Sequence, residues 1–203
     1  MRQLHYYAGL TIAVFVAFHL LNHLSSLYGP ETHIAMMVTL RTVYRHPLVE
    51  TILLSAVLVQ VGSGLRLFWQ TRQSTTTFYE KMHRWTGLYL ATFFLVHLSA
   101  VLGGRLLLHL DTNFYFGVAG LNTFPFSLFF VPYYGLAILS FFGHIASIHQ
   151  KKGTRTIAGL PPVSQANGIL LMGILLTVVI FYGLTNGFQG VAIPVEYNVL
   201  IGR

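Results

Sequence analysis

Five apolar segments, each long enough to cross a membrane as a helix, divide this sequence. They occupy approximately residues 5–28, 47–70, 84–108, 126–149 and 168–188. A transmembrane helix needs about 20 mostly apolar residues. The segments and their connections use all 203 residues, which leaves no room for a soluble catalytic domain. We therefore predict an all-α integral membrane protein with a single domain, residues 1–203, and five transmembrane helices.

The composition argues against two other classes of protein. Charged residues make up 8% of the chain, whereas ordinary soluble domains carry about 25%. The net charge of +7 is typical of basic loops on a membrane protein, so we expect contact with a lipid bilayer and no nucleic-acid partner. The chain has no cysteine, so it can form no disulfide and cannot hold an iron–sulfur cluster with its own thiolates.

The basic residues are distributed unevenly between the two predicted membrane faces. The positive-inside rule predicts a multi-pass protein of the cell (inner) membrane, with a cytoplasmic N-terminus and the C-terminus outside. The face of the N-terminus and of the second and fourth connections carries Arg2, Arg72, Lys81, Arg84, Lys151, Lys152 and Arg155, and the opposite face carries Arg41, Arg45, Arg105 and Arg203.

One sequence phrase occurs twice, as LHYYAGLTIAVFVAFHL in residues 4–20 and as MHRWTGLYLATFFLVHL in residues 82–98. Pro47 and Pro125, which open the next predicted helices, are separated by the same offset. The repeat therefore predicts a duplicated helical hairpin with the fifth helix added at its flank. The matched pairs are His5 with His83, Gly9 with Gly87, Phe15 with Phe93, and His19 with His97.

His19 and His97 are the strongest candidates for a cofactor site. They lie at equal depth on two helices that run in the same direction, each one turn after a phenylalanine. Ionisable residues within a membrane are costly and usually functional, and paired imidazoles are good axial ligands for haem iron. Polar residues that hydrogen-bond between helices are the alternative, but a repeated pair at matched depth favours ligation. The bundle is thus predicted to bind haem.

The other membrane histidines leave alternatives open. His5 and His83 could ligate a second haem, or hold a haem propionate or a quinone head group at the membrane edge. His144 could ligate a second haem with an unidentified partner, hydrogen-bond a propionate or quinone, or be a satisfied core residue. The second predicted helix has no histidine at the corresponding depth and offers Gln60 instead, a poor ligand for iron.

Five further histidines are given less weight. His23 follows His19 by one turn, but no third ligand with suitable spacing for zinc is evident. We expect His23 to lie near the outer interface. The remaining four, His33, His46, His109 and His149, are predicted to be solvated loop or helix-end residues.

The first predicted helix resembles that of the cytochrome b membrane anchor of succinate:quinone oxidoreductases and fumarate reductases. The similarity is greatest to the single-chain, five-helix, two-haem anchor associated with menaquinone. His83-Arg84-Xaa-Thr86-Gly87 resembles the HR-x-[ST]-G opening of anchor helices in that superfamily, and Phe93 and His97 fit the ligand helix. In the first helix the matching residues are Arg2, Leu4, His5, Gly9, Leu10, Phe15, His19, Leu20 and Asn22.

The resemblance implies that His19 and His97 hold the haem farther from the cytoplasm. His144 matches one ligand of the nearer haem, but the other ligand falls near Gln60 and is absent. The chain therefore has either one haem b or a second haem that is ligated differently.

The resemblance also implies partners and a reaction. An iron–sulfur subunit would dock on the cytoplasmic face and a flavoprotein would oxidise succinate or reduce fumarate. The chain would be the quinone-reactive anchor, with no flavin or iron–sulfur site of its own, and would carry electrons through haem to or from quinone, expected to be menaquinone. The implied quinone pocket uses His83, Arg84 and Thr86.

Two other functions compete with this expectation. The chain could be a different di-histidine membrane cytochrome b, of the b561-like or hydrogenase-associated kind. It could also be a non-redox helical membrane protein in which the histidines relay protons or join helices.

Overall fold

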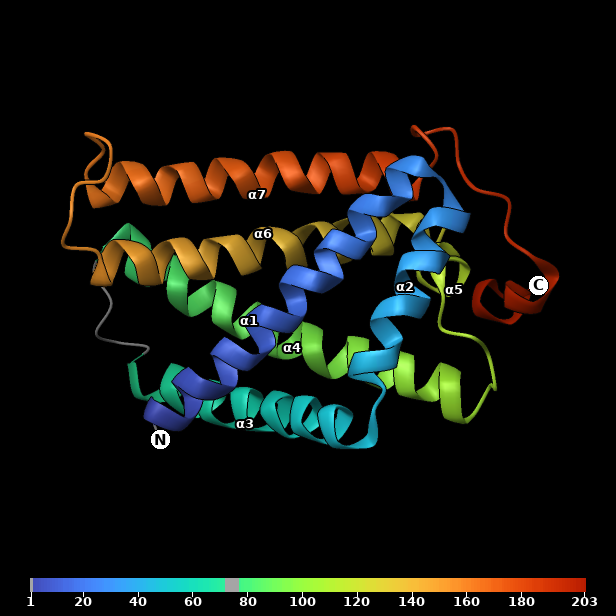
Figure 1. The fold of residues 1–203 in the computed structure, drawn as a ribbon, viewed down its shortest axis with the longest axis horizontal. Helices are drawn as coiled ribbons and strands as arrows, with labels where there is room; N and C mark the ends of the chain where they lie inside the picture. Colours follow the sequence, from blue (N-terminus) through green and yellow to red (C-terminus); the bar gives the residue numbers. More distant parts are fainter. Residues whose placement is uncertain (1, 72–76) are drawn as a thin grey trace.

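The computed structural model describes residues 2–71 and 77–203, and the described residues form helices and connections without a β-strand. Arg72 and residues 73–76, in the polar connection between the second and third predicted helices, lie outside the described residues. Figure 1 shows the arrangement. The elements are α1 Arg2–Leu24, η1 Ser25–Tyr28, α2 Pro30–Tyr44, α3 Pro47–Thr71, α4 Phe78–Leu106, α5 Phe114–Val118, α6 Ser127–Lys152, α7 Pro162–Leu184 and η2 Val195–Ile201.

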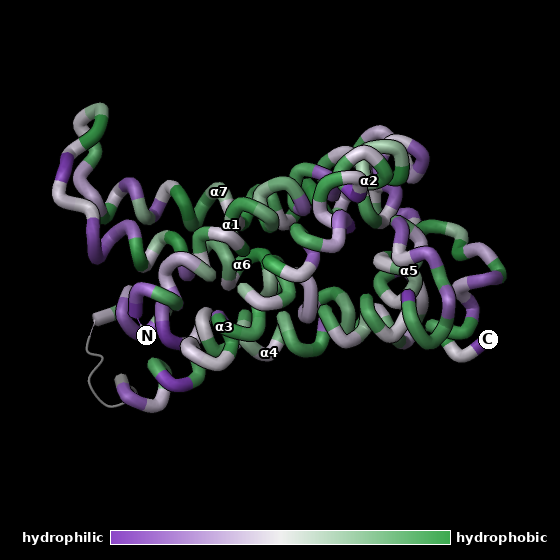
Figure 2. Tube along the Cα trace, turned by 60° about the horizontal axis from the view of Figure 1, so that its bottom comes forward, coloured by the Kyte–Doolittle hydropathy of each residue, from purple (hydrophilic) through white to green (hydrophobic). Residues whose placement is uncertain are grey.

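Five of these helices, α1 (continued by η1), α3, α4, α6 and α7, are long and apolar enough to cross a membrane. The prediction of five membrane-spanning helices is confirmed at this level. Hydrophilic residues concentrate in the connections at the two ends of the bundle, and the helices between them are mostly hydrophobic (Figure 2).

Four of the long helices lie side by side in the order α3, α4, α6 and α7, and α1 crosses this layer diagonally (Figure 1). Near its start α1 packs on α3, and near its end it packs on α7. Between these two contacts α1 has no extended backbone packing with α4 or α6 within the described residues. The rings of His19 and His97 lie in the interval between α1 and α4. We call the end of the bundle that holds the N-terminus the N-end, and the end that holds α2, α5 and the C-terminus the C-end.

The polar stretch from Glu31 to His46, whose composition predicts an outer loop with a short interfacial helix, instead forms most of the 15-residue helix α2. α2 begins at Pro30 directly after Gly29, whose φ of 103° turns the chain sharply. Figure 1 shows that α2 runs across the bundle axis at the C-end. It buries His33 and Met37, so this helix is a packed cap over the C-end.

Local capping sets where two of the long helices begin. α4 begins at Phe78 rather than at Arg84, because Thr77 and Glu80 form a capping box in which each side chain accepts from the other residue's backbone N–H. α7 begins at Pro162 rather than at Gly168, with proline in the first turn. Both starts extend the helices into the polar zone at the N-end.

The main hydrophobic core lies toward the C-end. Phe114 and Val118 of α5 are almost completely buried there, together with Ile180 of α7. α6 and α7 approach closely because Gly173 has no side chain: a Cβ at that position would lie 2.5 Å from Cβ of Phe142. A smaller cluster of Ala8, Ile12 and Ala56 joins α1 to α3.

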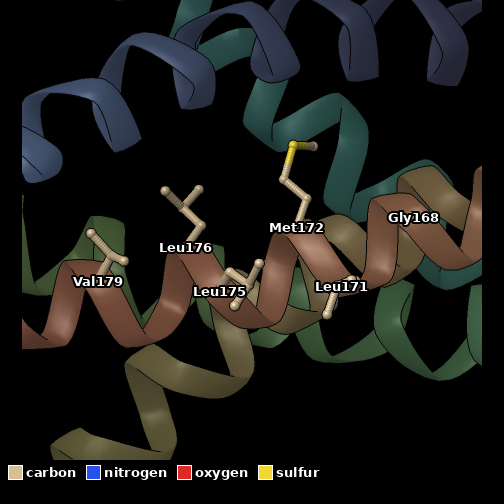
Figure 3. Close-up of a pocket in the computed structure, with 6 residues that line it drawn as sticks. All are labelled: Gly168, Leu171, Met172, Leu175, Leu176 and Val179. Atoms are coloured by element: carbon tan, nitrogen blue, oxygen red, sulfur yellow. The ribbon is translucent and has the colours of Figure 1, made fainter.

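α7 presents a wholly apolar surface away from this core. A shallow groove follows one face of the helix, with side chains that include Leu171, Met172 and Leu175 (Figure 3). Leu171 and Leu175 are each 57% exposed. Such exposure is expected for a surface that contacts lipid tails, in agreement with the predicted position of this helix at the flank of the bundle.

Candidate functional site

The buried histidines fall into two groups at the two ends of the bundle. The C-end cluster contains His19, His23, His33 and His97, and the N-end cluster contains His5, Gln60, Ser63, His83 and His144. No three His, Asp or Glu side chains within residues 2–71 and 77–203 are placed to hold a bare metal ion. A haem needs only two axial nitrogens, so pairs of imidazoles are the relevant arrangement.

His19 of α1 and His97 of α4 face each other across the interval between their helices. Their ring centres are 6.2 Å apart and the ring planes are inclined by 68°. Two imidazoles that ligate one metal from opposite sides, each through a nitrogen about 2 Å from the metal, have ring centres about 6 Å apart. The separation of His19 and His97 therefore fits axial ligation of one haem iron.

Each of these imidazoles stacks on the phenylalanine one turn before it. Phe15 and His19 are inclined by only 18°, and Phe93 and His97 by 12°, with centroid distances of 5.7 and 5.0 Å. Tyr133 of α6 packs against Phe93 at 4.8 Å. The aromatic side chains thus pack against both imidazoles and hold their ring planes.

His23 extends the C-end cluster toward α2. Its Nε2 lies 3.1 Å from Nε2 of His19, and its Nδ1 lies 3.3 Å from Nε2 of His33. Axial ligation by His19 through Nε2 would release its contact with His23. His23 is thus a partly buried member of a polar chain that links α1 to the α2 cap.

The prediction that His33 is a solvated residue is wrong. His33 is only 3% exposed, because α2 folds over the end of the bundle and turns this side chain inward. Its Nε2 accepts a hydrogen bond from Nδ2 of Asn22 at 3.2 Å. Burial, with the charges of His19 and Arg41, lowers the pKa of His33 to about 4, so the ring is neutral at pH 7.

A small cavity adjoins the C-end cluster between α1 and α2. Its lining includes His19, Asn22 and Tyr44. Its volume of about 20 Å³ is sufficient for one water molecule. Oδ1 of Asn22, which lines this cavity, is buried without a protein partner, so it is a polar atom that a water there could bind.

At the N-end, His5 of α1 is held by α3. Its Nδ1 lies 2.8 Å from Oγ of Ser63, and its Nε2 lies 3.3 Å from Nε2 of Gln60. A Cβ on Gly9 would lie 3.3 Å from the Gln60 amide, and a Cβ on Gly64 would lie 3.5 Å from Cε1 of His5. The two glycines therefore make room for these polar side chains between α1 and α3.

His144 of α6 is held by α4. Its Nδ1 lies 3.2 Å from the carbonyl oxygen of His83 and 3.3 Å from Oγ1 of Thr86. The rings of His83 and His144 stack, with centroids 4.1 Å apart and planes inclined by 21°. A Cβ on Gly87 would lie 3.2 Å from Cε1 of His144, so Gly87 makes room for an imidazole of the neighbouring helix.

The residues predicted for a quinone pocket are distributed unevenly around this cluster. His83 has a buried Nδ1 without a partner. The guanidinium of Arg84 lies 5.8 Å from the ring centre of Trp85. The hydroxyl of Thr86 donates to the carbonyl oxygen of Met82 at 2.7 Å. Its proton is therefore used in a hydrogen bond within α4.

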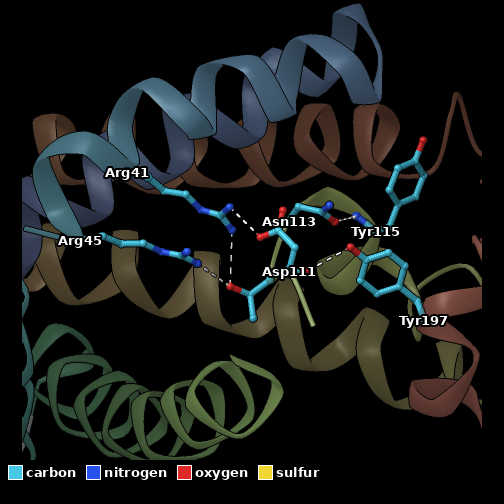
Figure 4. Close-up of polar contacts among 7 residues, drawn as sticks. Arg41, Arg45, Asp111, Asn113, Tyr115 and Tyr197 are labelled. Atoms are coloured by element: carbon cyan, nitrogen blue, oxygen red, sulfur yellow. Dashed lines mark hydrogen bonds and ion pairs between the residues drawn. The ribbon is translucent and has the colours of Figure 1, made fainter. Parts of the chain in front are cut away.

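Polar contacts close the C-end around the cap (Figure 4). Arg41 of α2 forms an ion pair of 2.7 Å with Asp111, and Arg45 donates to Oγ1 of Thr112 at 3.0 Å. Burial, with the charge of Arg41, lowers the pKa of Arg45. The hydroxyl of Tyr197 donates to the carbonyl oxygen of Asp111, and burial next to that carboxylate raises the pKa of Tyr197.

An ion pair also joins α3 to α4 near the C-end. Nη1 of Arg105 lies 2.6 Å from Oε1 of Glu50. Both side chains are partly buried. The ion pair with Arg105 explains why an apolar helix carries the carboxylate of Glu50 in its first turn. The sequence alone indicates no role for Glu50.

Two site residues, Ser63 and His33, have no role in the sequence-based prediction. Ser63 lies one turn after Gln60 and directly before Gly64, which places the three on one side of α3 as a local signal of a polar contact. His33 has no comparable signal, because its burial depends on how α2 crosses the bundle.

Comparison with models of protein families, with characterised proteins and with solved structures finds no match to this chain.

Proposed function

We propose that this chain is the membrane-anchor cytochrome b subunit of a succinate:quinone oxidoreductase, with His19 and His97 as axial ligands of a b-type haem. The observation that carries the proposal is the pair of imidazoles with ring centres 6.2 Å apart, borne on two different membrane helices. A bis-histidine haem supplies one-electron transfer without an open iron position. Together with the resemblance of the first and third predicted helices, the pair favours an electron carrier over a non-redox bundle.

The surroundings of the pair are suitable for this role. Phe15 and Phe93 support the two rings, and Tyr133 packs behind Phe93. Buried, neutral imidazoles are the form that binds iron. The chain's own contribution is to fix two nitrogens at one level of the bilayer and to keep that level dry.

The N-end is the proposed site for the quinone, expected to be menaquinone. His83 offers a buried Nδ1 without a protein partner, and Arg84 follows it in the same turn. An N–H donor of this kind can bind a quinone carbonyl oxygen. Thr86 is better explained as a support for His144, because its own proton is donated to Met82.

The same end is the proposed docking face for the iron–sulfur subunit, and through it for the flavoprotein. The basic residues at the N-end include Lys81, Arg84, Lys151 and Lys152. By the positive-inside rule this end is cytoplasmic, in the cell (inner) membrane. The absence of cysteine from the sequence agrees with a division of labour in which a partner carries the iron–sulfur clusters.

The test is an optical spectrum of the protein purified from membranes with its partners. We expect a dithionite-reduced b-type spectrum, and loss of one haem per chain in His19→Ala and in His97→Ala. His46→Ala is the matched control, because His46 is an exposed histidine between α2 and α3. A colourless protein that also fails to take up haem, or an unchanged low-spin spectrum in both variants, would reject the proposal.

The identity of the complex is tested separately by what purifies with the chain. A flavoprotein with covalently bound flavin, together with an iron–sulfur subunit, is the expected result. A haem-containing chain with neither partner would instead indicate another membrane cytochrome b.

A further inference from the structure

The connection between α6 and α7 contains a tight turn at the N-end, closed by a single antiparallel bridge. The backbone N–H of Ile157 donates to the carbonyl oxygen of Leu160 at 3.1 Å, and the N–H of Leu160 donates back at 2.9 Å. The two residues between them, Ala158 and Gly159, have φ values of 50° and 77°. Positive φ at both positions is typical of the type I′ turn. Residues 157–160, which we call the tip, therefore have a defined conformation.

One side chain of α7 holds this connection in place. Nε2 of Gln165 donates to the carbonyl oxygen of Arg155 at 3.0 Å and to that of Leu160 at 2.7 Å. Its Oε1 accepts from Nε2 of His149 at 2.8 Å. Gln165 thus joins the connection to the end of α6 and presents the tip as a preformed surface, which lowers the ordering cost of binding.

The tip is apolar and exposed. Ile157 and Leu160 are 59% and 52% exposed, and as directly opposed residues they lie on one face of the bridge. Ala158 occupies a turn position that favours Asn or Gly, so the tip carries no polar side chain. Hydrophobic residues are visible at the outer end of this connection in Figure 2. A fixed apolar surface of this kind indicates a site of interaction.

The tip adjoins the lipid-facing surface of α7. In both views the connection extends past the start of α7 on the side away from α6 (Figure 1 and Figure 2). Val163 in the first turn of α7 is 45% exposed. Ile174, about three turns further on the same stripe, is 51% exposed. The apolar surface therefore continues from the helix that contacts lipid to the tip beside its first turn.

The residues on the α6 side of the tip are basic. Lys151, Lys152 and Arg155 are exposed, and the sequence has no acidic residue between Asp111 and Glu196. Anionic lipid head groups attract basic residues near a membrane surface. Long Lys and Arg side chains also extend from an apolar surface to place their charge at the interface. Charge and apolarity therefore fit the same ligand, an anionic lipid bilayer.

We propose that the tip is a lipid-binding surface that inserts Ile157 and Leu160 into the interface of an anionic bilayer beside α7. Lys151 and Arg155 then lie at the lipid phosphates. The position of the tip at the flank, next to a helix surface that contacts lipid, favours lipid over a protein partner that docks on the end of the bundle. The inference goes beyond the proposed function, because it requires neither haem nor a partner subunit.

The chain has no cysteine, so an introduced cysteine is its sole site for a nitroxide label. The full chain is labelled at Ile157→Cys or Leu160→Cys and placed in nanodiscs of equal parts phosphatidylcholine and phosphatidylglycerol. By electron paramagnetic resonance, we expect both labels to collide more with oxygen than with a water-soluble nickel complex. Leu175→Cys on the lipid-facing surface of α7 should give the same pattern, and the exposed Thr154→Cys should give the reverse.

A second comparison tests the charge of the lipid. In nanodiscs of phosphatidylcholine alone, or with Arg155→Gln in the mixed discs, the labels at 157 and 160 should shift toward access by nickel. An unchanged pattern under both conditions would overturn the assignment to anionic lipid. Nickel access at 157 and 160 equal to that at 154 would show that the tip lies in water. Low access to both reagents would show that protein covers the tip, such as a second copy of the chain, and either result would overturn the inference.

Discussion

A Cβ placed on Gly87 of α4 would lie 3.2 Å from Cε1 of His144 on α6. The His144 ring can occupy its position only because Gly87 has no side chain. We predict that Gly87→Leu displaces the ring and lowers the midpoint of thermal unfolding in detergent, because overpacking of this kind typically costs about 1–3 kcal/mol.

Gly103→Leu is the control for this substitution. Gly103 lies on the same helix, and a Cβ there would meet nothing within 4 Å. It should leave the unfolding midpoint unchanged. An equal decrease in both variants would indicate a general effect on α4 rather than a specific clash with His144.

A second prediction concerns the packing of α7 on α6. Gly173→Ala places a Cβ 2.5 Å from Cβ of Phe142, and overpacking of this kind typically costs about 1–3 kcal/mol. We expect a lower midpoint of thermal unfolding in detergent. Gly168→Ala on the same helix has no neighbour within 4 Å and should be neutral or slightly stabilising, so a similar loss in both would contradict the packing argument.

A third prediction concerns the ion pair of Glu50 and Arg105 between α3 and α4. The side chains are 26% and 30% exposed, so the pair should contribute about 1 kcal/mol or less. Either charge reversal, Glu50→Arg or Arg105→Glu, should lower the unfolding midpoint, and the double exchange should recover part of the loss. A strictly additive double variant would show that the two side chains do not interact.

Much of the fold can be predicted from the lengths of the apolar segments alone, because a bilayer demands helices of about 20 residues. The α2 helix cannot be predicted from the length of an apolar segment. Its sequence from Glu31 to His46 is polar enough to resemble a loop, and only its packing over the C-end buries His33 and Met37. A short amphipathic helix at a membrane surface is stabilised by tertiary contacts that the sequence does not display.

The candidate site was only partly predictable for the same reason. His19 and His97 are indicated by their repeated spacing, and the structure brings their rings to a distance that fits a shared metal. The contacts of His5 with Gln60 and Ser63 depend on the packing of α1 on α3, which is a tertiary feature. A prediction based on matched depth expects the partner ligand of His144 on α3, at the position of Gln60.

The fourth prediction is a pH dependence of stability that originates at His33. Burial, His19 and Arg41 lower the pKa of this imidazole from 6.5 to about 4. Between these values the unfolded chain binds a proton that the folded chain does not, so stability is complete above about pH 6.5 and falls as the pH decreases toward 4. The loss attributable to His33 is at most about 3 kcal/mol, and the groups that face it are His23, Asn22 and Phe114.

His33→Gln tests this assignment, because glutamine can hydrogen-bond Asn22 and His23 but does not titrate. The variant should be less stable than the wild type at pH 8, where the native ring packs best, and should lose less stability between pH 6.5 and 4. His46→Gln changes an exposed histidine and should reproduce the wild-type profile. The test measures thermal midpoints across this pH range. If the midpoint of His33→Gln falls with pH in parallel with that of the wild type, groups other than His33 cause the acid sensitivity.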